Sequence, residues 1–96
     1  ESQVILNGSY NINFTMDLVL KDTGLFDDLA KKLGTPLEIS PKVVEIFKDG
    51  QKKYGSRAWS SMIVKRMEDM NNINFRANGF PEELTDNEPE EKGYEI

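Results

Sequence analysis

The chain of 96 residues is long enough for one small domain, and it contains neither cysteine nor histidine. It therefore has no disulfide framework, no thiolate zinc site and no Ser-His or Cys-His catalytic arrangement. The net charge of -5 comes from residues 81–96, which hold seven acids and one lysine, whereas residues 1–80 are nearly neutral. No basic surface for nucleic acid and no membrane-spanning or signal segment is predicted, so we expect a soluble, cytoplasmic protein.

The N-terminal segment, residues 1–13, reads ESQVILNGSYNIN. A short apolar run followed by Asn-Gly-Ser and further asparagines predicts irregular structure. The chain opens on Glu1, and its first apolar cluster, at 4–6, belongs to no complete predicted element. From this we expect a piece of a longer protein.

Helical spacing of apolar residues begins at Phe14 and predicts an amphipathic helix over 15–33 that packs through its apolar stripe. Gly34 and Pro36 mark the end of this helix. The stripe consists of Phe14, Leu18, Leu25, Leu29 and Leu33, widened by Phe26 and Ala30.

Two further helices follow. Ser40 can cap the second helix, Pro41 suits its first position, and Tyr54-Gly55 ends it. Ser56 can cap the third helix. The apolar side of the second helix is formed by Val43, Ile46, Phe47, Gly50 and Tyr54, and that of the third by Trp59, Met62, Ile63, Met67 and Met70.

The predicted fold is therefore all-α: a small bundle of three main amphipathic helices over residues 14–70. Residues 71–96 combine prolines, glycines and many acids with isolated aromatic residues, which predicts an acidic and largely irregular tail. The tail is interpreted as a solvated element, although Phe75, Phe80 and Tyr94 leave docking on the body open.

The Lys21-Asp22 pair, early in the first helix, has two interpretations. Asp17 precedes Lys21 by four residues, a spacing at which a surface ion pair stabilises a helix slightly. Alternatively, Lys21 is a cation near a helix start, beside the aromatic Phe14, and faces an anionic or aromatic ligand held by another domain. Periodicity does not choose between these interpretations.

Two other groups of residues are weaker candidates for a functional site. The Trp59, Met62 and Met67 stripe could form a partner groove, but this spacing is more typical of core. Asp27 and Asp28 are adjacent on a helix, point about 100° apart and have no third ligand near them, so no metal site is predicted.

Three groups of residues occur in the order found in a known family. The first is Phe14, three residues, Leu18, two residues and Lys21-Asp22; then come LAKKLGTPLEIS at 29–40 and YGSRAWSSMIVKRME at 54–68. Across roughly residues 12–70 the chain resembles the C-terminal helical domain of the β-hydroxyacid dehydrogenases, the group containing 3-hydroxyisobutyrate dehydrogenase and tartronate semialdehyde reductase.

The resemblance implies an oxidoreductase of two domains that uses NAD or NADP and acts on a small β-hydroxyacid or its semialdehyde. It implies that Lys21 reaches toward the cofactor and Phe14 lines the same cleft, while Asp22 orients or supports them. In such enzymes the helical domain closes the cleft and supports homo-oligomerisation.

The family's Gly-x-Gly-x-x-Gly turn and its helix with the catalytic lysine have no match in this chain. No catalytic residue is therefore predicted here, and we expect residues 1–96 alone to be inactive. Apolar surfaces that a missing helix would cover predict self-association. The alternative function is a stand-alone helical interaction or dimerisation module without a cofactor.

Overall fold

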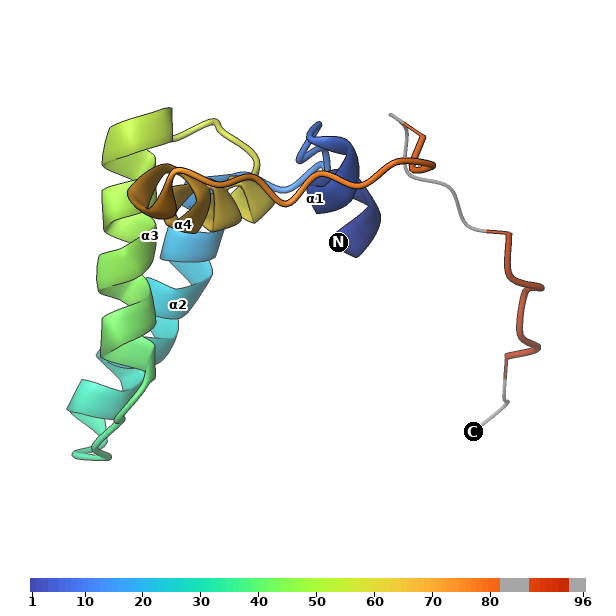
Figure 1. The fold of residues 1–96 in the computed structure, drawn as a ribbon. Coiled ribbons are helices and arrows are strands. Elements are labelled where there is room, and N and C mark those ends of the chain that lie inside the picture. Colours follow the sequence, from blue (N-terminus) through green and yellow to red (C-terminus); the bar gives the residue numbers. More distant parts are fainter. Residues whose placement is uncertain (82–86, 94–96) are drawn as a thin grey trace.

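The computed structural model describes residues 1–81 and 87–93, and within them the chain forms helices and no strand. The α-helices are α1 (Ser2–Asn7), α2 (Met16–Lys32), α3 (Ser40–Tyr54) and α4 (Ile63–Asn71), with a short 3-10 helix at Ser60–Met62. Helices α2 and α3 lie side by side as an antiparallel hairpin, α4 crosses one end of it, and α1 lies beyond α4 (Figure 1). The predicted all-α class is confirmed.

The prediction of irregular structure for residues 1–13 is wrong at Ser2–Asn7, which form α1. A helix of six residues is too short to be stable by itself or to show a clear period in the sequence. Tertiary contacts hold it: Val4 is fully buried, and the Leu6 carbonyl accepts a hydrogen bond from the Ala77 amide at 3.0 Å. Gly8, at φ 84°, adopts the left-handed conformation that ends the helix.

The core lies where α2, α3 and α4 meet. Met16, the first residue of α2, has no exposed surface, and Gly50 of α3 is buried beside it. A β-carbon at Gly50 would lie 2.8 Å from Ile63 Cδ1 and 3.0 Å from Met16 Sδ. The glycine therefore lets the three helices approach closely at this point, which agrees with its place on the predicted apolar side of α3.

The third helix begins later than predicted. Ser56 does not cap it; α4 starts at Ile63, after the 3-10 turn. The segment before that turn runs past the start of α2, where Met16 donates its amide to the Ala58 carbonyl at 2.9 Å and Asp17 to the Ser56 carbonyl at 3.0 Å. These carbonyls accept hydrogen bonds from two amides that have no acceptor within α2, so residues 56–58 cap α2 instead of starting a helix.

Helix α2 does not pack through its predicted stripe. Of the predicted stripe, Ala30 is buried. The contact is otherwise formed by another face of α2, on which Met16 is buried and Leu20 points toward α3. The small side chains of Thr23, on that face, and of Ala30 allow α3 to approach. The large side chains of the predicted stripe are exposed: Leu18 by 38%, Leu25 by 60%, Phe26 by 57%, Leu29 by 54% and Leu33 by 70%.

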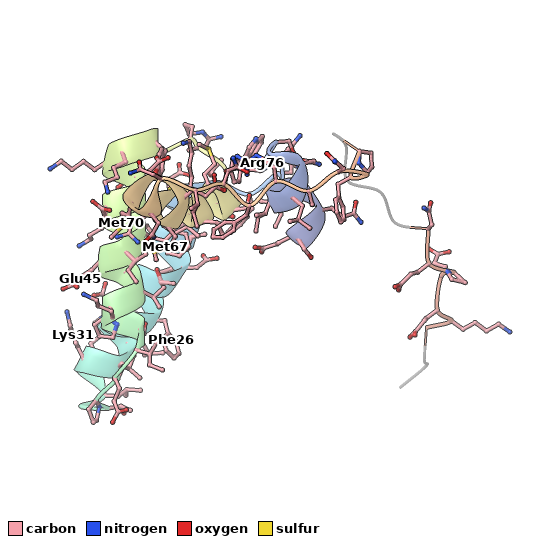
Figure 2. The ribbon with its side chains drawn as sticks, viewed as in Figure 1. Phe26, Lys31, Glu45, Met67, Met70 and Arg76 are labelled. Atoms are coloured by element: carbon pink, nitrogen blue, oxygen red, sulfur yellow. The ribbon has the colours of Figure 1, made fainter. Side chains whose placement is uncertain are left out.

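A buried carboxylate joins α1, α4 and the segment that follows α4. Glu68 is 4% exposed and accepts hydrogen bonds from the Tyr10 hydroxyl at 2.7 Å and from Arg76 Nη1 at 3.0 Å. Arg76 also lies 5.0 Å from the centre of the Tyr10 ring and donates to the Ile5 carbonyl at 3.1 Å. Figure 2 shows Arg76 beside α1. This cluster fixes the start of the segment after α4 to the body.

Beyond α4 the described residues 73–81 and 87–93 form neither helix nor strand, as predicted for this part of the tail. Phe75 and Phe80 are each 38% exposed, and Tyr94 lies outside the described residues. The strongest tie between this segment and the body comes from Arg76, which the sequence analysis did not single out.

The Glu68 cluster predicts a loss of stability in acid. Burial alone would raise the pKa of Glu68, but the hydrogen bonds from Tyr10 and Arg76 outweigh burial and hold it below the ordinary value. The unfolded chain therefore binds this proton more readily. The contribution is complete above about pH 4.3 and is lost as the pH falls through the lower pKa of the folded state. Denaturant unfolding at several pH values should show a shallower acid dependence for Glu68→Gln than for the wild type, and equal slopes would contradict this.

Candidate functional site

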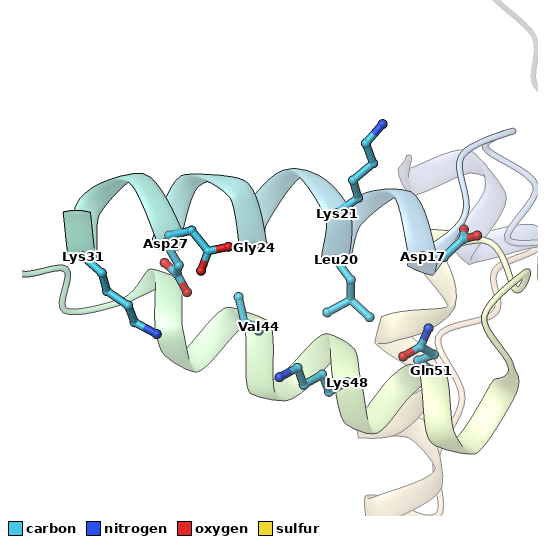
Figure 3. A pocket seen from close by; sticks show the side chains of 10 residues that line it. Asp17, Leu20, Lys21, Gly24, Asp27, Lys31, Val44, Lys48 and Gln51 are labelled. Carbon is cyan, nitrogen blue, oxygen red and sulfur yellow. The ribbon is translucent and has the colours of Figure 1, made fainter. Parts of the chain in front are cut away.

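An open groove of about 440 Å³ runs between α2 and α3 (Figure 3). Leu20 and Val44 form its apolar floor, and its walls are charged. The charged residues are Asp17, Asp27, Asp28, Lys21, Lys31 and Lys48. With equal numbers of acids and lysines, the groove has no net charge of its own, so its chemistry depends on which of these groups are already paired.

Asp17 is already paired. Its carboxylate accepts hydrogen bonds from the Thr15 hydroxyl, from Arg57 Nη1 at 3.2 Å and from the Leu18 amide at 3.0 Å. The Thr15 bond, with the Arg57 guanidinium and the Leu18 amide, holds the pKa of Asp17 below its ordinary value. Asp17 therefore stays ionised at neutral pH, in the first turn of α2, where a negative charge is favoured.

Lys21 does not form the ion pair with Asp17 that its spacing allowed. Among the described residues it has no carboxylate within 4.0 Å, because Asp17 is bound by Arg57 from the loop after α3. Lys21 is exposed on the wall of the groove, and its ammonium points outward, away from α3 (Figure 3). The structure thus leaves one cation near the start of α2 free for a ligand.

Phe14 lies outside the groove. It precedes α2, its side chain is 37% exposed, and its carbonyl accepts the Ser60 amide at 2.7 Å. The structure therefore does not bring Phe14 and Lys21 into one groove within this chain. Asp22 likewise does not line the groove, and it points from α2 on the side of the exposed apolar stripe.

The part of the groove near the end of α2 was not predicted from the sequence. Ser40 does not cap α3, because α3 begins at Ser40 itself; its hydroxyl donates instead to Asp27 Oδ1 at 2.5 Å and ties the two helices together. Lys31, exposed near the end of α2, also lines the groove. A signal was present: positions 17, 21, 24, 28 and 31 recur every three or four residues and so share one face of a helix.

No group of three or more carboxylate, histidine or cysteine side chains suited to a metal ion occurs within residues 1–81 and 87–93. None of the helices formed there combines the length and hydropathy needed to cross a membrane. Comparison with known protein families, with curated proteins and with solved structures gave no match for this chain.

Proposed function

We propose that this chain forms the C-terminal helical part of an NAD(P)-dependent dehydrogenase that acts on a small β-hydroxyacid or its semialdehyde. The observation that carries the proposal is the state of Lys21: its ammonium is exposed and has no carboxylate partner within the described residues. The order of Phe14, Leu18, Lys21 and Asp22 around the start of α2, followed by the α2–α3 hairpin, supports it.

Lys21 suits a role in binding an anionic cofactor. A lysine ammonium on a flexible stem acts as a point charge, and it binds phosphate without needing one fixed geometry. Because Arg57 already neutralises Asp17, the Asp17 carboxylate attracts the Lys21 ammonium only weakly and does not compete with a ligand. Phe14, partly exposed at the start of the same helix, is proposed to exclude water at the edge of the cleft.

The proposed role of this chain follows from the residues that it contains. A nicotinamide cofactor supplies or accepts the hydride when it is bound. This chain has no histidine or cysteine, and its proposed part is to bind the cofactor, close the cleft and support a homo-oligomer. The proposed substrate class is the one that the family resemblance implies, a small hydroxyacid.

The reading frame upstream of the codon for Glu1 tests the proposal most directly. We expect it to encode a strand, a Gly-x-Gly-x-x-Gly turn and a helix, followed by a long helix that carries a lysine. A start codon within a few residues of Glu1 would contradict the proposal, because the chain would then lack the parts that bind the dinucleotide.

Lys21→Ala in the full-length enzyme should weaken use of the cofactor. We expect KM for the cofactor to rise, or kcat to fall, about tenfold, since one charge-assisted contact is worth about 1.5 kcal/mol. Steady-state kinetics with NAD and NADP measure this effect. Lys32→Ala, an exposed lysine on the same helix that does not line the groove, is the matched control. Equal kinetics for both variants would mean that Lys21 is a solvated surface residue and does not bind the cofactor.

The exposed stripe on α2 favours the second candidate, a helical interaction module without a cofactor. Titration of the full-length protein with NADH, followed by cofactor fluorescence, distinguishes the two candidates. A signal that Lys21→Ala weakens and Lys32→Ala does not would favour the dehydrogenase.

A further inference from the structure

The sequence contains two Asn-Gly steps, Asn7-Gly8 and Asn78-Gly79. Such a step can react without a catalyst, because the asparagine side chain reaches the backbone amide that follows it and glycine has no β-carbon to block the approach. The reaction needs a free asparagine side chain and a free glycine amide. The fold engages these groups in hydrogen bonds at one step and leaves them free at the other.

Hydrogen bonds engage the step at Asn7-Gly8. The Asn7 side-chain amide donates to the Pro81 carbonyl, and its Oδ1 accepts the Ser9 amide at 2.7 Å. The Gly8 amide donates to the Ile5 carbonyl at 3.2 Å, where α1 ends. Asn7 and Gly8 are both half-buried. Asn7 can therefore react only when the end of α1 opens locally.

The step at Asn78-Gly79 lies in an exposed turn of the segment that follows α4 and runs past α1 (Figure 1). In the part of the chain that the structure describes, neither the Asn78 side chain nor the Gly79 amide has a hydrogen-bond partner. Gly79 has φ 90°, which glycine tolerates, and a β-carbon at this position would meet no atom within 4 Å. Water and the Asn78 side chain therefore have open access to the Gly79 amide.

We propose that Asn78 is a site of spontaneous modification, at which the folded protein converts the asparagine to isoaspartate or aspartate, whereas the fold protects Asn7. The Gly79 amide nitrogen attacks the side-chain carbonyl carbon of Asn78. A new C–N bond closes a succinimide ring, and the side-chain nitrogen leaves as ammonia. Water then opens the ring at either carbonyl and leaves a carboxylate, so the net reaction consumes water, releases ammonia and needs no oxidant or reductant. This inference does not rest on the proposed dehydrogenase function.

The product changes a segment that is bound to α1 on both sides of residue 78. The Ala77 amide donates to the Leu6 carbonyl at 3.0 Å, and the Pro81 carbonyl accepts the Asn7 side-chain amide. Isoaspartate carries the main chain through its β-carbon, so it lengthens the backbone between these two hydrogen bonds by one atom. We expect both bonds to weaken, so that the modification slowly releases this segment from α1.

Peptide mass spectrometry of the full-length protein, kept at mildly alkaline pH and sampled over days, tests the site. We expect the peptide with Asn78 to convert at least about tenfold faster than the peptide with Asn7, because Asn7-Gly8 must first lose its hydrogen bonds. In strong denaturant the two peptides should convert at similar rates, since both glycine amides are then accessible. Asn78→Gln is the control and should abolish conversion at residue 78, because its longer side chain closes a six-membered ring far more slowly. Equal rates in the folded protein, or an Asn7 that stays slow in denaturant, would overturn the proposal.

Amide hydrogen exchange tests the consequence for the segment. Ion exchange separates the converted protein from the unconverted protein by its added negative charge. We expect the Ala77 amide to exchange about tenfold faster in the isoaspartate form, because its hydrogen bond to Leu6 is weakened. Asn78→Asp is the matched control: it adds the same charge without the extra backbone atom, and its Ala77 amide should exchange as in the wild type. An isoaspartate form that exchanges no faster than Asn78→Asp would overturn the release of the segment.

Discussion

Met16→Ala should lower the free energy of unfolding by about 3 kcal/mol. Met16 has no exposed surface, and its sulfur lies 3.0 Å from where a β-carbon of Gly50 would be, at the crossing of α2, α3 and α4. Truncation removes apolar contacts there and leaves a cavity that three helices cannot easily fill. Thermal unfolding followed by circular dichroism should show the melting temperature reduced by roughly 10–20 °C.

Met70→Ala is the matched control for this substitution. Met70 is 63% exposed, so its loss should change the free energy of unfolding by no more than about 0.5 kcal/mol. Gly50→Ala should be tolerated better together with Met16→Ala than alone, because the sulfur that crowds the new methyl group is then absent. Equal losses for Met16→Ala and Met70→Ala would show that the helices do not cross at Met16.

Arg76→Ala should lower the free energy of unfolding by about 2–3 kcal/mol. The substitution leaves the carboxylate of Glu68, which is 4% exposed, without its cationic partner, and it removes the bond to the Ile5 carbonyl. Because the Arg76 side chain is itself 35% exposed, water can enter and limit the loss. Denaturant unfolding at pH 7 measures the effect, and hydrogen exchange in α1 should increase because α1 loses a tie to the body.

The control for Arg76→Ala is Arg57→Ala. Arg57 also pairs with a carboxylate, but its side chain is 80% exposed, so its removal should cost no more than about 0.5 kcal/mol. The difference between the two variants should shrink in acid, where Glu68 becomes protonated and needs no cation. A pH-independent loss for Arg76→Ala would mean that packing on Tyr10, rather than the charge of Glu68, holds the segment.

The sequence by itself determined the helical class, the spans of α2 and α3 and the irregular nature of the described tail, because periodicity, Gly34, Pro36 and the Tyr54-Gly55 step act locally. It also placed Gly50 on the packed side of α3. These features depend on neighbours within one or two turns, which the order of residues specifies directly.

Only the tertiary structure decided which face of α2 packs, where α4 begins and what Lys21 can bind. The stripe with the largest apolar residues stays exposed because α3 approaches the side with Thr23 and Ala30, and periodicity does not say which of two faces finds a partner. Asp17 forms its ion pair with Arg57, far along the sequence, and not with Lys21, and Glu68 pairs with Arg76 from the segment after α4. Such pairings arise only after the chain has folded, because they join residues on different elements.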